Sequence, residues 1–271
     1  MPIAPFCWRR ARTVVASGPE WGAPGAGLQG EWRLQWSGRR GGQRRPSRVP
    51  SMHVEATWYF DVVSPFAYLQ WRRLQRLGIE GLLLRPVLFA ALLDHAGHKG
   101  PAEIPAKRRF TYRQVAWRAA RDGIALVFPP AHPFNPLPAL RLCVAAGATA
   151  DVVDAVFRWI WEEGRAVRHP DEIAGLARRI GIVDAPAALA QPWVKQALRE
   201  NLAHALREEV FGVPTLVCRG ELFWGDDATP MFMDYLRDPG WLHSEGMQRL
   251  SRLPVAAVRP GALRGPASDR R

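Results

Sequence analysis

The segment FDVVSPFAYL, residues 60–69, decides the fold of this 271-residue chain. Residues 57–62 (TWYFDV) are β-branched and aromatic, which is typical of a strand. Ser64 and Pro65 then predict the start of a helix, because serine is a favoured N-cap and proline at the first helical position needs no amide hydrogen. Apolar residues continue at helical spacing up to Gly78. The sequence therefore predicts a strand that passes directly into a helix.

The flanking segments extend this pattern in both directions. Residues 82–88 predict a second strand, and a β-α-β unit implies a parallel pair with a right-handed crossover. Helix-compatible spacing follows at 106–121, 138–146, 150–163, 171–180 and 192–210. Two strands at 215–218 and 221–224 flank a tight turn at Arg219-Gly220, and a last helix covers about 229–236. This order predicts an α/β sheet protein with a large all-helical insertion.

The net charge of +12 resides mainly in the two ends of the chain. Residues 1–51 contain nine arginines and two glutamates, and residues 252–271 contain five arginines and one aspartate. The remaining residues, 52–251, are left at about +1. The overall charge therefore does not indicate a nucleic-acid-binding function. No apolar run of membrane-spanning length occurs in the sequence, so we expect no membrane association.

The three cysteines, Cys7, Cys143 and Cys218, form no C-x-x-C pair and have no metal-ligand spacing. An odd number of cysteines without close pairs is typical of proteins in a reducing compartment, so we expect a cytoplasmic protein. Cys143 and Cys218 lie in apolar segments and are expected to be buried packing residues. His95 and His98 are three residues apart, but no cysteine or carboxylate completes a zinc set, so no metal site is predicted.

Ser64 stands where thiol oxidoreductases of this topology place the first cysteine of a C-x-x-C, because a helix N-terminus stabilises a thiolate. The sequence here is Ser64-Pro65-Phe66-Ala67, which cannot form a disulfide. Dithiol redox chemistry is therefore excluded at this position. A helix N-terminus with a hydroxyl donor remains, and it suits the binding of an external thiolate. The alternative is that Ser64 is only a helix N-cap.

A second motif, Gly212-Val213-Pro214-Thr215, precedes a predicted strand. In thioredoxin-like proteins a proline here is typically cis and faces the helix N-terminus. The backbone of the residue before it can pair with a peptide such as glutathione. The alternative is a simple loop proline. The occurrence of this motif after S-P-F-A at a strand–helix junction favours a thioredoxin-like sheet with a large all-helical insertion.

Five ordered segments resemble the 2-hydroxychromene-2-carboxylate isomerases, which are relatives of the kappa-class glutathione transferases and of DsbA-like oxidoreductases. They are FDVVSPFAYL (60–69), AGHKGPAEIPAKRRFTYR (96–113), FPPAHPFNPLPALRL (128–142), FGVPTLV (211–217) and LFWGDD (222–227). The resemblance runs from about residue 55 to residue 236. It implies a thioredoxin-like fold and glutathione as the cofactor.

The resemblance also assigns site residues. The thiol-contacting serine of the family falls on Ser64, and a lysine that helps bind glutathione falls on Lys107. His98 stands in place of an asparagine that also helps bind glutathione. The residue before the expected cis-proline, whose backbone pairs with the glutathione cysteine, falls on Val213.

The segment Gly225-Asp226-Asp227-Ala228 falls where the family binds the γ-glutamyl group of glutathione. Asp227 keeps the carboxylate for the γ-glutamyl ammonium. Asp226 replaces a neutral polar residue, and Ala228 replaces an arginine. A second negative charge at Asp226 is expected to weaken glutathione binding unless its side chain binds backbone amides.

The implied activity is a glutathione-dependent cis–trans isomerisation of 2-hydroxychromene-2-carboxylate or a related intermediate of aromatic degradation. A thiolate that adds to the unsaturated carbon leaves a single bond that rotates, and elimination restores the double bond. The expected partners are glutathione and a small aromatic substrate, and a homodimer is compatible with this assignment. Three alternatives stay open. Two are a kappa-like glutathione transferase and a non-catalytic thioredoxin-like module that binds a peptide or protein. The third and weakest is a nucleic-acid-binding protein that acts through the basic residues 1–51.

The domain organisation follows from the same segments. Residues 1–51 are expected to be a disordered or non-native extension, because no apolar period is sustained before Met52. Residues 52–90 and 211–240 are expected to form the thioredoxin-like domain, with residues 91–210 as the helical insertion domain. Residues 252–271 are expected to be a disordered tail.

Three further features have plainer interpretations. The basic run at 107–109 is more typical of a solvated helix face than of a nucleic-acid interface. The segment 132–136 is either a helix entry or a wall of the substrate pocket. Trp117, Trp159 and Trp161 are expected in the core, although one or two could line an aromatic substrate pocket.

Overall fold

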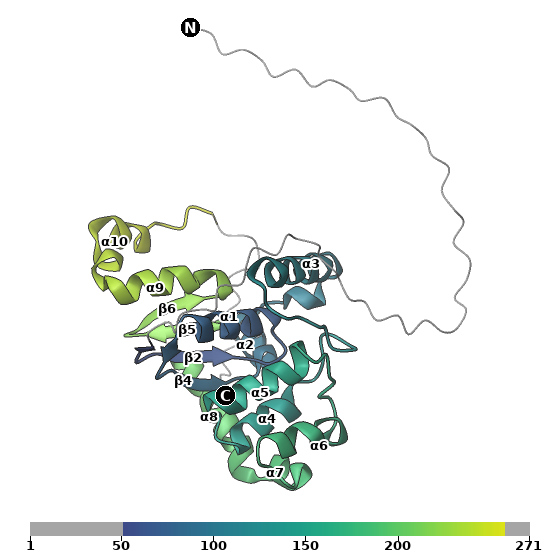
Figure 1. Ribbon diagram of the computed structural model, residues 1–271. Coiled ribbons are helices and arrows are strands. Elements are labelled where there is room, and N and C mark those ends of the chain that lie inside the picture. Colours follow the sequence, from purple (N-terminus) through teal and green to yellow (C-terminus); the bar gives the residue numbers. More distant parts are fainter. Residues whose placement is uncertain (1–50, 258–271) are drawn as a thin grey trace, which may run out of the picture. The chain divides into compact units, whose positions relative to one another are not determined.

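The predicted strand–helix–strand segment forms β2, α1 and β4 (Figure 1). The computed structural model describes residues 51–257. Strand β2 spans Thr57–Phe60, helix α1 spans Pro65–Arg76, and strand β4 spans Leu83–Pro86. All four residues of β2 pair in parallel with β4. The predicted β-α-β unit is confirmed.

The main sheet has the strand order β4-β2-β5-β6. Strands β5 (Thr215–Cys218) and β6 (Glu221–Trp224) have the predicted bounds, and the β2–β5 and β5–β6 pairs are antiparallel. Arg219 and Gly220 join them as a two-residue turn. Their φ angles are 52° and 85°, and a two-residue turn that matches the twist of the strands requires such positive values. This mixed sheet is the one expected of an α/β thioredoxin-like fold.

A second, two-stranded sheet was not predicted. Strand β1 (Met52–His53) pairs in parallel with β3 (Ile79–Glu80). Two residues are too few to show the alternation of polar and apolar side chains by which a strand is recognised in a sequence.

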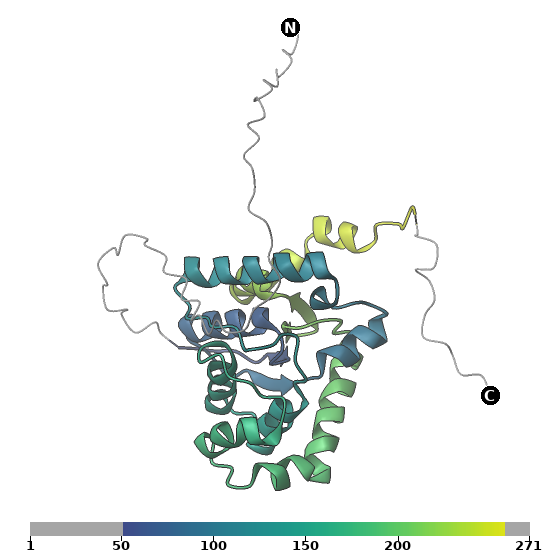
Figure 2. The same ribbon diagram turned by 90° about the vertical axis from the view of Figure 1, so that its right-hand side faces the viewer.

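The connection from β4 to β5 is helical, as predicted. Its α-helices are α2 (Phe89–Ala96), α3 (Pro105–Asp122), α4 (Leu137–Ala145), α5 (Ala150–Trp161), α6 (Pro170–Arg179), α7 (Ala185–Ala190) and α8 (Pro192–Arg207). Five of them end within three residues of the predicted bounds. The sequence did not reveal α2 or α7, whose eight and six residues each cover only about two helical turns. A 3₁₀ turn, η1 (Pro101–Glu103), precedes α3, which lies alongside α1 (Figure 2).

The chain after β6 is also helical. A 3₁₀ turn η2 (Asp226–Ala228) leads into α9 (Thr229–Arg237), close to the predicted 229–236. A second 3₁₀ turn, η3 (Pro239–His243), and helix α10 (Glu245–Ser251) follow.

The two faces of the main sheet have separate cores, because successive side chains of a strand point to opposite faces. Trp58, Phe60 and Leu216 pack on one face with residues of α1, α5 and α9. Tyr59 and Val217 pack on the other face with residues of α2 and α8. The helices therefore cover both sides of the sheet (Figure 1).

The helical insertion shares its core with the sheet. The ring of Phe157 in α5 lies 6.0 Å from that of Trp58 and 5.6 Å from that of Phe60, both in β2. The described residues belong to one compact unit. The boundaries at residues 90 and 210 between a sheet domain and an insertion domain remain predictions.

The expectation for the three tryptophans is correct for two of them. Trp159 and Trp161 are buried, but the residue Trp117 is 57% exposed. Trp117 lies on the outer face of α3, where the guanidinium of Arg121, one turn later, lies 4.7 Å from its ring. A cation over the ring face stabilises an aromatic side chain without burying it in the core.

The expectations for the two chain ends, 1–51 and 252–271, fall mostly on residues that the structure does not describe. These are residues 1–50 and 258–271. The disorder proposed for the extension and for the tail remains a prediction there.

Gln70 of α1 joins the first helix to the end of β6. This fully buried side chain accepts a hydrogen bond from Trp58 Nε1 at 2.7 Å and donates to the Gly225 carbonyl at 2.9 Å. Its amide nitrogen also lies 3.0 Å from the Thr229 hydroxyl. The contacts fix the η2 turn relative to α1.

We expect Gln70→Leu to lower the free energy of unfolding by roughly 1–3 kcal/mol, because the buried indole of Trp58 loses its acceptor. The Gly225 carbonyl keeps a bond from the Ala228 amide. Urea unfolding followed by tryptophan fluorescence measures this change. Gln196→Leu, at an exposed glutamine on α8, is the control and should change stability by less than about 0.5 kcal/mol. Equal stabilities of the two variants would contradict the role of Gln70.

Candidate functional site

Ser64 caps helix α1 and keeps a hydroxyl hydrogen to donate. Its backbone is extended, and its Oγ accepts a hydrogen bond from the Ala67 amide at 3.3 Å. The residue is only 7% exposed. Within the described part of the chain, no acceptor takes the hydroxyl hydrogen. The N-cap role is therefore real, and it leaves the hydroxyl able to donate to a group placed at the helix N-terminus.

Asp61 organises the turn that leads to Ser64. One carboxylate oxygen accepts from the Val63 amide at 3.0 Å, and the other accepts from the Phe89 amide at 2.8 Å. The Asp61 carbonyl accepts from the Ser64 amide at 3.0 Å. The side chain is completely buried. Hydrogen bonds within the turn between β2 and α1 therefore stabilise it, and a further one connects it to the start of α2.

Two side chains from the helical insertion hold the other carbonyls of this turn. Trp161 Nε1, at the end of α5, donates to the Val62 carbonyl at 2.9 Å. His132 Nε2 lies 2.8 Å from the Val63 carbonyl. The Tyr112 hydroxyl on α3 lies 2.8 Å from His132 Nδ1. Residues more than sixty positions away along the chain therefore fix the backbone in front of Ser64.

The Val213-Pro214 peptide is cis and lies at the same end of the sheet. Thr215, two residues after Val213, pairs with Tyr59 in the β2–β5 ladder, which sets the cis bond level with the turn after β2. Val213 is 7% exposed, and neither its amide nor its carbonyl has a hydrogen-bond partner among the described residues. These unpaired groups can bind an extended peptide.

Asp226 is balanced by two arginines rather than by backbone amides. Its completely buried carboxylate lies 3.0 Å from Arg73 on α1 and 3.0 Å from Arg118 on α3. Burial raises the pKa of Asp226, and the two guanidinium groups oppose that rise. The expected excess of negative charge at this position is therefore compensated within the protein. The Asp226 side chain points toward the arginines and not toward solvent.

Asp227 is the accessible carboxylate of this pair. Its side chain is 74% exposed, and one of its oxygens lies 4.0 Å from Arg118 Nη2. A guanidinium and an exposed carboxylate thus stand side by side at the η2 turn. Ala228 stands where the family that the sequence resembles has an arginine. Arg118 places a positive charge at the same turn, although it belongs to α3 and is far away in the sequence.

The other two predicted residues are exposed. Lys107 lies in the first turn of α3, and His98 lies between α2 and η1. Neither side chain has a hydrogen bond or ion pair to another described residue. Ser64 caps α1, Val213 lies at the same end of the sheet, and the η2 turn contacts α1. Among the described residues, no contact joins Lys107 or His98 to these three.

The residues that support the site were not predicted from the sequence. Asp61 directly follows a strand, and a carboxylate at a buried strand end is a signal that could have been noticed. His132 lies within a segment already considered for the substrate pocket. Arg73 and Arg118 sit on helices as ordinary basic residues, and no sequence spacing connects them to Asp226.

The fold and the site define a thioredoxin-fold protein of the DsbA type, without cysteines at the start of α1. The DsbA-like thioredoxin domain matches residues 56–237, and the chain belongs to this family.

The similar proteins include the isomerases that the sequence resembles. The chain is 31% identical over 180 residues to the 2-hydroxychromene-2-carboxylate isomerase of Pseudomonas putida, covering 63% of this chain and 88% of that protein. It is 28% identical over 190 residues to the enzyme of the same name from Sphingobium xenophagum, covering 67% and 97%. Glutathione S-transferase kappa 1 of Rattus norvegicus is 24% identical over 206 residues, covering 68% and 91%. The resemblance is confirmed.

Solved structures support the fold. A 2-hydroxychromene-2-carboxylate isomerase structure superposes with a TM-score of 0.59 at 24% identity, covering 72% of this chain and all of that one. A probable DsbA oxidoreductase from Streptomyces coelicolor gives a TM-score of 0.51 at 17% identity, covering 77% and 94%. The thioredoxin-like fold with a helical insertion is confirmed.

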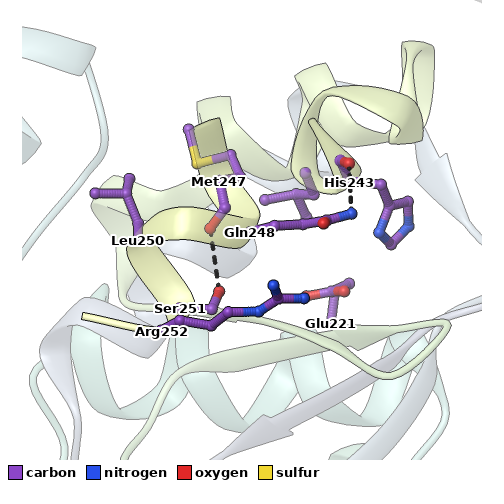
Figure 3. A pocket seen from close by; sticks show the side chains of 8 residues that line it. Glu221, His243, Met247, Gln248, Leu250, Ser251 and Arg252 are labelled. Carbon is purple, nitrogen blue, oxygen red and sulfur yellow. Dashed lines mark hydrogen bonds between the residues drawn. The ribbon is translucent and has the colours of Figure 1, made fainter. Parts of the chain in front are cut away.

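A surface pocket of about 330 Å³ lies away from these residues, between β6 and the C-terminal helices (Figure 3). Its polar side chains come from Glu221, His243, Gln248, Ser251 and Arg252. None of the residues predicted for the site lines it.

Two negative findings concern the residues that the structure describes. Between residues 51 and 257, no group of three or more His, Cys, Asp or Glu side chains could hold a metal ion. No helix in this range combines the length and the apolar character needed to cross a membrane.

The burial of Asp61 predicts a pH dependence of stability. Burial raises its pKa from 3.8 to about 7, against the opposing effect of the Val63 and Phe89 amides. Between about pH 4 and pH 7 the folded protein keeps a proton that the unfolded chain has lost. The contribution of Asp61 to the free energy of unfolding therefore falls as the pH rises through this range, by up to about 4 kcal/mol, and is constant above it.

Comparing the wild type with Asp61→Asn isolates this contribution, because the other titrating groups are shared. We expect the wild type to lose stability relative to Asp61→Asn from pH 4 to pH 7 in urea unfolding. Asp94→Asn, at an exposed aspartate of α2, is the control for the loss of a carboxylate that is not buried. A difference for Asp61→Asn that does not change with pH would show that the Asp61 carboxyl has an ordinary pKa.

Proposed function

We propose that this protein is a glutathione-dependent isomerase. Its substrate is 2-hydroxychromene-2-carboxylate or a related aromatic-degradation intermediate, which it converts by cis–trans isomerisation and ring opening. The observation that carries the proposal is Ser64, a hydroxyl donor at the N-terminus of α1 with no cysteine at position 64 or 67. The names of the two isomerase relatives support the reaction class.

Glutathione fits the unpaired polar groups of the site. The free backbone of Val213 suits the peptide of its cysteine. The exposed Asp227 carboxylate and the neighbouring Arg118 suit the γ-glutamyl ammonium and carboxylate. Lys107 is proposed to bind a further carboxylate of glutathione and His98 to donate a hydrogen bond.

When bound with its cysteine on the Val213 backbone, glutathione would supply a thiolate nucleophile for the unsaturated carbon of the substrate. The Ser64 hydroxyl donates a hydrogen bond to the sulfur. The partial positive charge at the start of α1 favours the same anion. Both effects lower the pKa of the thiol, so Ser64 stabilises the nucleophile and does not itself attack carbon.

Asp226 supports this site indirectly. By pairing with Arg73 and Arg118 it fixes the η2 turn, from which Asp227 projects. We therefore propose Asp227 as the glutathione ligand and Asp226 as a residue that positions it.

A transferase reaction is the second candidate, because two relatives are named glutathione S-transferase kappa 1. An isomerase regenerates glutathione, whereas a transferase consumes one molecule per turnover. Free thiol counted during conversion of 2-hydroxychromene-2-carboxylate separates the two. A binding module without enzymatic activity gives no conversion at all.

Ser64→Ala should raise the pKa of bound glutathione, measured from thiolate absorbance against pH. The lost bond is charge-assisted and contributes roughly 1.5–3 kcal/mol, so turnover should fall about tenfold to a hundredfold. The loss of the N-cap should also lower stability by about 1 kcal/mol.

Thr149→Ala is the matched control for the cap. Thr149 caps α5 with a bond of 3.4 Å to the Val152 amide, close to the 3.3 Å of Ser64. It should lose similar stability and keep both activity and thiol pKa. If Ser64→Ala behaves like Thr149→Ala in every respect, Ser64 is only a cap.

Asp227→Asn should weaken glutathione binding about tenfold to a hundredfold in calorimetry, since a charge-assisted hydrogen bond contributes roughly 1.5–3 kcal/mol. Asp234→Asn on α9 also removes one exposed carboxylate, which is 64% exposed and pairs with Arg237. It should leave binding unchanged. If Asp227→Asn and Asp234→Asn bind glutathione with equal affinity, Asp227 is not a glutathione ligand.

A further inference from the structure

His132 lies against the peptide that precedes Ser64. Its Nε2 atom is 2.8 Å from the Val63 carbonyl, although the two residues are 69 positions apart in the chain. A carbonyl oxygen can only accept a hydrogen bond, so Nε2 carries a hydrogen. The imidazole therefore donates to the Val63–Ser64 peptide.

Tyr112 completes the assignment of the ring. Its hydroxyl lies 2.8 Å from Nδ1 of His132 and 2.8 Å from the carbonyl of the same residue. Burial lowers the pKa of His132, which favours the neutral ring with a lone pair on Nδ1. The hydroxyl donates to that lone pair or to the carbonyl, and in both cases the hydrogen of the ring stays on Nε2.

The ring has little freedom to turn. Phe128, Phe134 and Trp161 pack around it, with ring centroids 5.5–6.5 Å away and interplanar angles between 61° and 83°. The hydrogen bond to the Val63 carbonyl is therefore held by packing as well as by Tyr112.

The other end of the same peptide is also fixed. The Ser64 amide donates to the Asp61 carbonyl at 3.0 Å. With its carbonyl bound by His132 and its N–H bound by Asp61, the peptide plane has one orientation. That orientation sets where the Ser64 hydroxyl points.

The structure assigns His132 as a positioning residue for Ser64, acting through the Val63 carbonyl, which holds the ring hydrogen on Nε2. The assignment deepens the proposed function and rests on it for its catalytic consequence. Without the imidazole the peptide can rotate, and the Ser64 hydroxyl loses its alignment to the sulfur. The effect should appear in the thiol pKa and kcat and not in the affinity for glutathione.

Two substitutions at position 132 test this role. His132→Phe keeps a ring in the aromatic cluster but removes the donor. His132→Gln places an amide nitrogen near the position of Nε2 and can restore the hydrogen bond. We expect His132→Phe to raise the pKa of bound glutathione and to lower kcat about twofold to tenfold, the loss of one neutral hydrogen bond, with an unchanged KM for glutathione. His132→Gln should recover most of both.

His204→Phe is the matched control. His204 on α8 also pairs with a tyrosine, Tyr59, through Nδ1 at 2.5 Å, on the opposite face of the sheet. It should lose comparable stability without a change in thiol pKa or kcat. If His132→Phe gives the same result as this control, His132 has only a structural role and the assignment is wrong.

Two measurements without glutathione keep this test separate from the proposed function. Long-range ¹H–¹⁵N correlation spectra of the full chain should show His132 neutral with its hydrogen on Nε2. Hydrogen exchange of the Ser64 amide should become faster in His132→Phe and return toward the wild-type rate in His132→Gln. A hydrogen on Nδ1, or an unchanged exchange rate, overturns the assignment even if glutathione binds. If both are as expected but the wild type binds no glutathione, the proposed function fails while the positioning contact stands.

Discussion

The turn from Asp61 to Ser64 is held by hydrogen bonds from three separate parts of the chain, and the site depends on this restraint. A strand that passes directly into a helix leaves backbone groups without ladder partners, and buried groups of this kind must be satisfied elsewhere. Here the Asp61 carboxylate accepts hydrogen bonds from two amides. Trp161 donates to the Val62 carbonyl, and His132 donates to the Val63 carbonyl. The result is a helix N-terminus whose direction is fixed before any ligand binds.

The origin of these partners shows what the helical insertion contributes to the turn. Trp161 ends α5, and His132 lies between α3 and α4, so the insertion supplies two of the three restraints. Packing of Phe157 against Trp58 and Phe60 places α5 on the sheet. The same packing that buries apolar surface thus delivers hydrogen-bond donors to the turn. The insertion and the sheet form one functional unit through these contacts.

Most of the fold could be predicted because its signals are local. Ser64-Pro65 marks the start of α1, and Arg219-Gly220 marks the turn between β5 and β6. Short elements such as α7 and the β1–β3 pair carry too few residues for a periodic pattern. Burial was harder to predict. Trp117 is a large aromatic residue of the kind usually found in the core, yet Arg121 on the same helix stabilises it at the surface.

The site could be predicted only as far as single positions. Ser64 is recognisable because it is defined by its place on a strand–helix junction. The compensation of Asp226 by Arg73 and Arg118 is a three-dimensional property, since α1, α3 and η2 meet only after folding. The sequence therefore suggested an unfavourable charge where the folded protein has a neutralised one. Positions follow from motifs, but electrostatic balance follows from packing.

The replacement of cysteine by serine changes the chemistry of the site without dismantling its electrostatics. In a thioredoxin-type site the helix N-terminus stabilises a thiolate that belongs to the protein. In this protein the helix N-terminus, the fixed peptide before it and the unpaired Val213 backbone all remain, but the described cysteines, Cys143 and Cys218, are buried elsewhere. Among the described residues, the site therefore has groups that can stabilise an anion but no sulfur of its own. A scaffold in this state suits a soluble thiol, because the preorganised groups then act on a sulfur that can bind and leave.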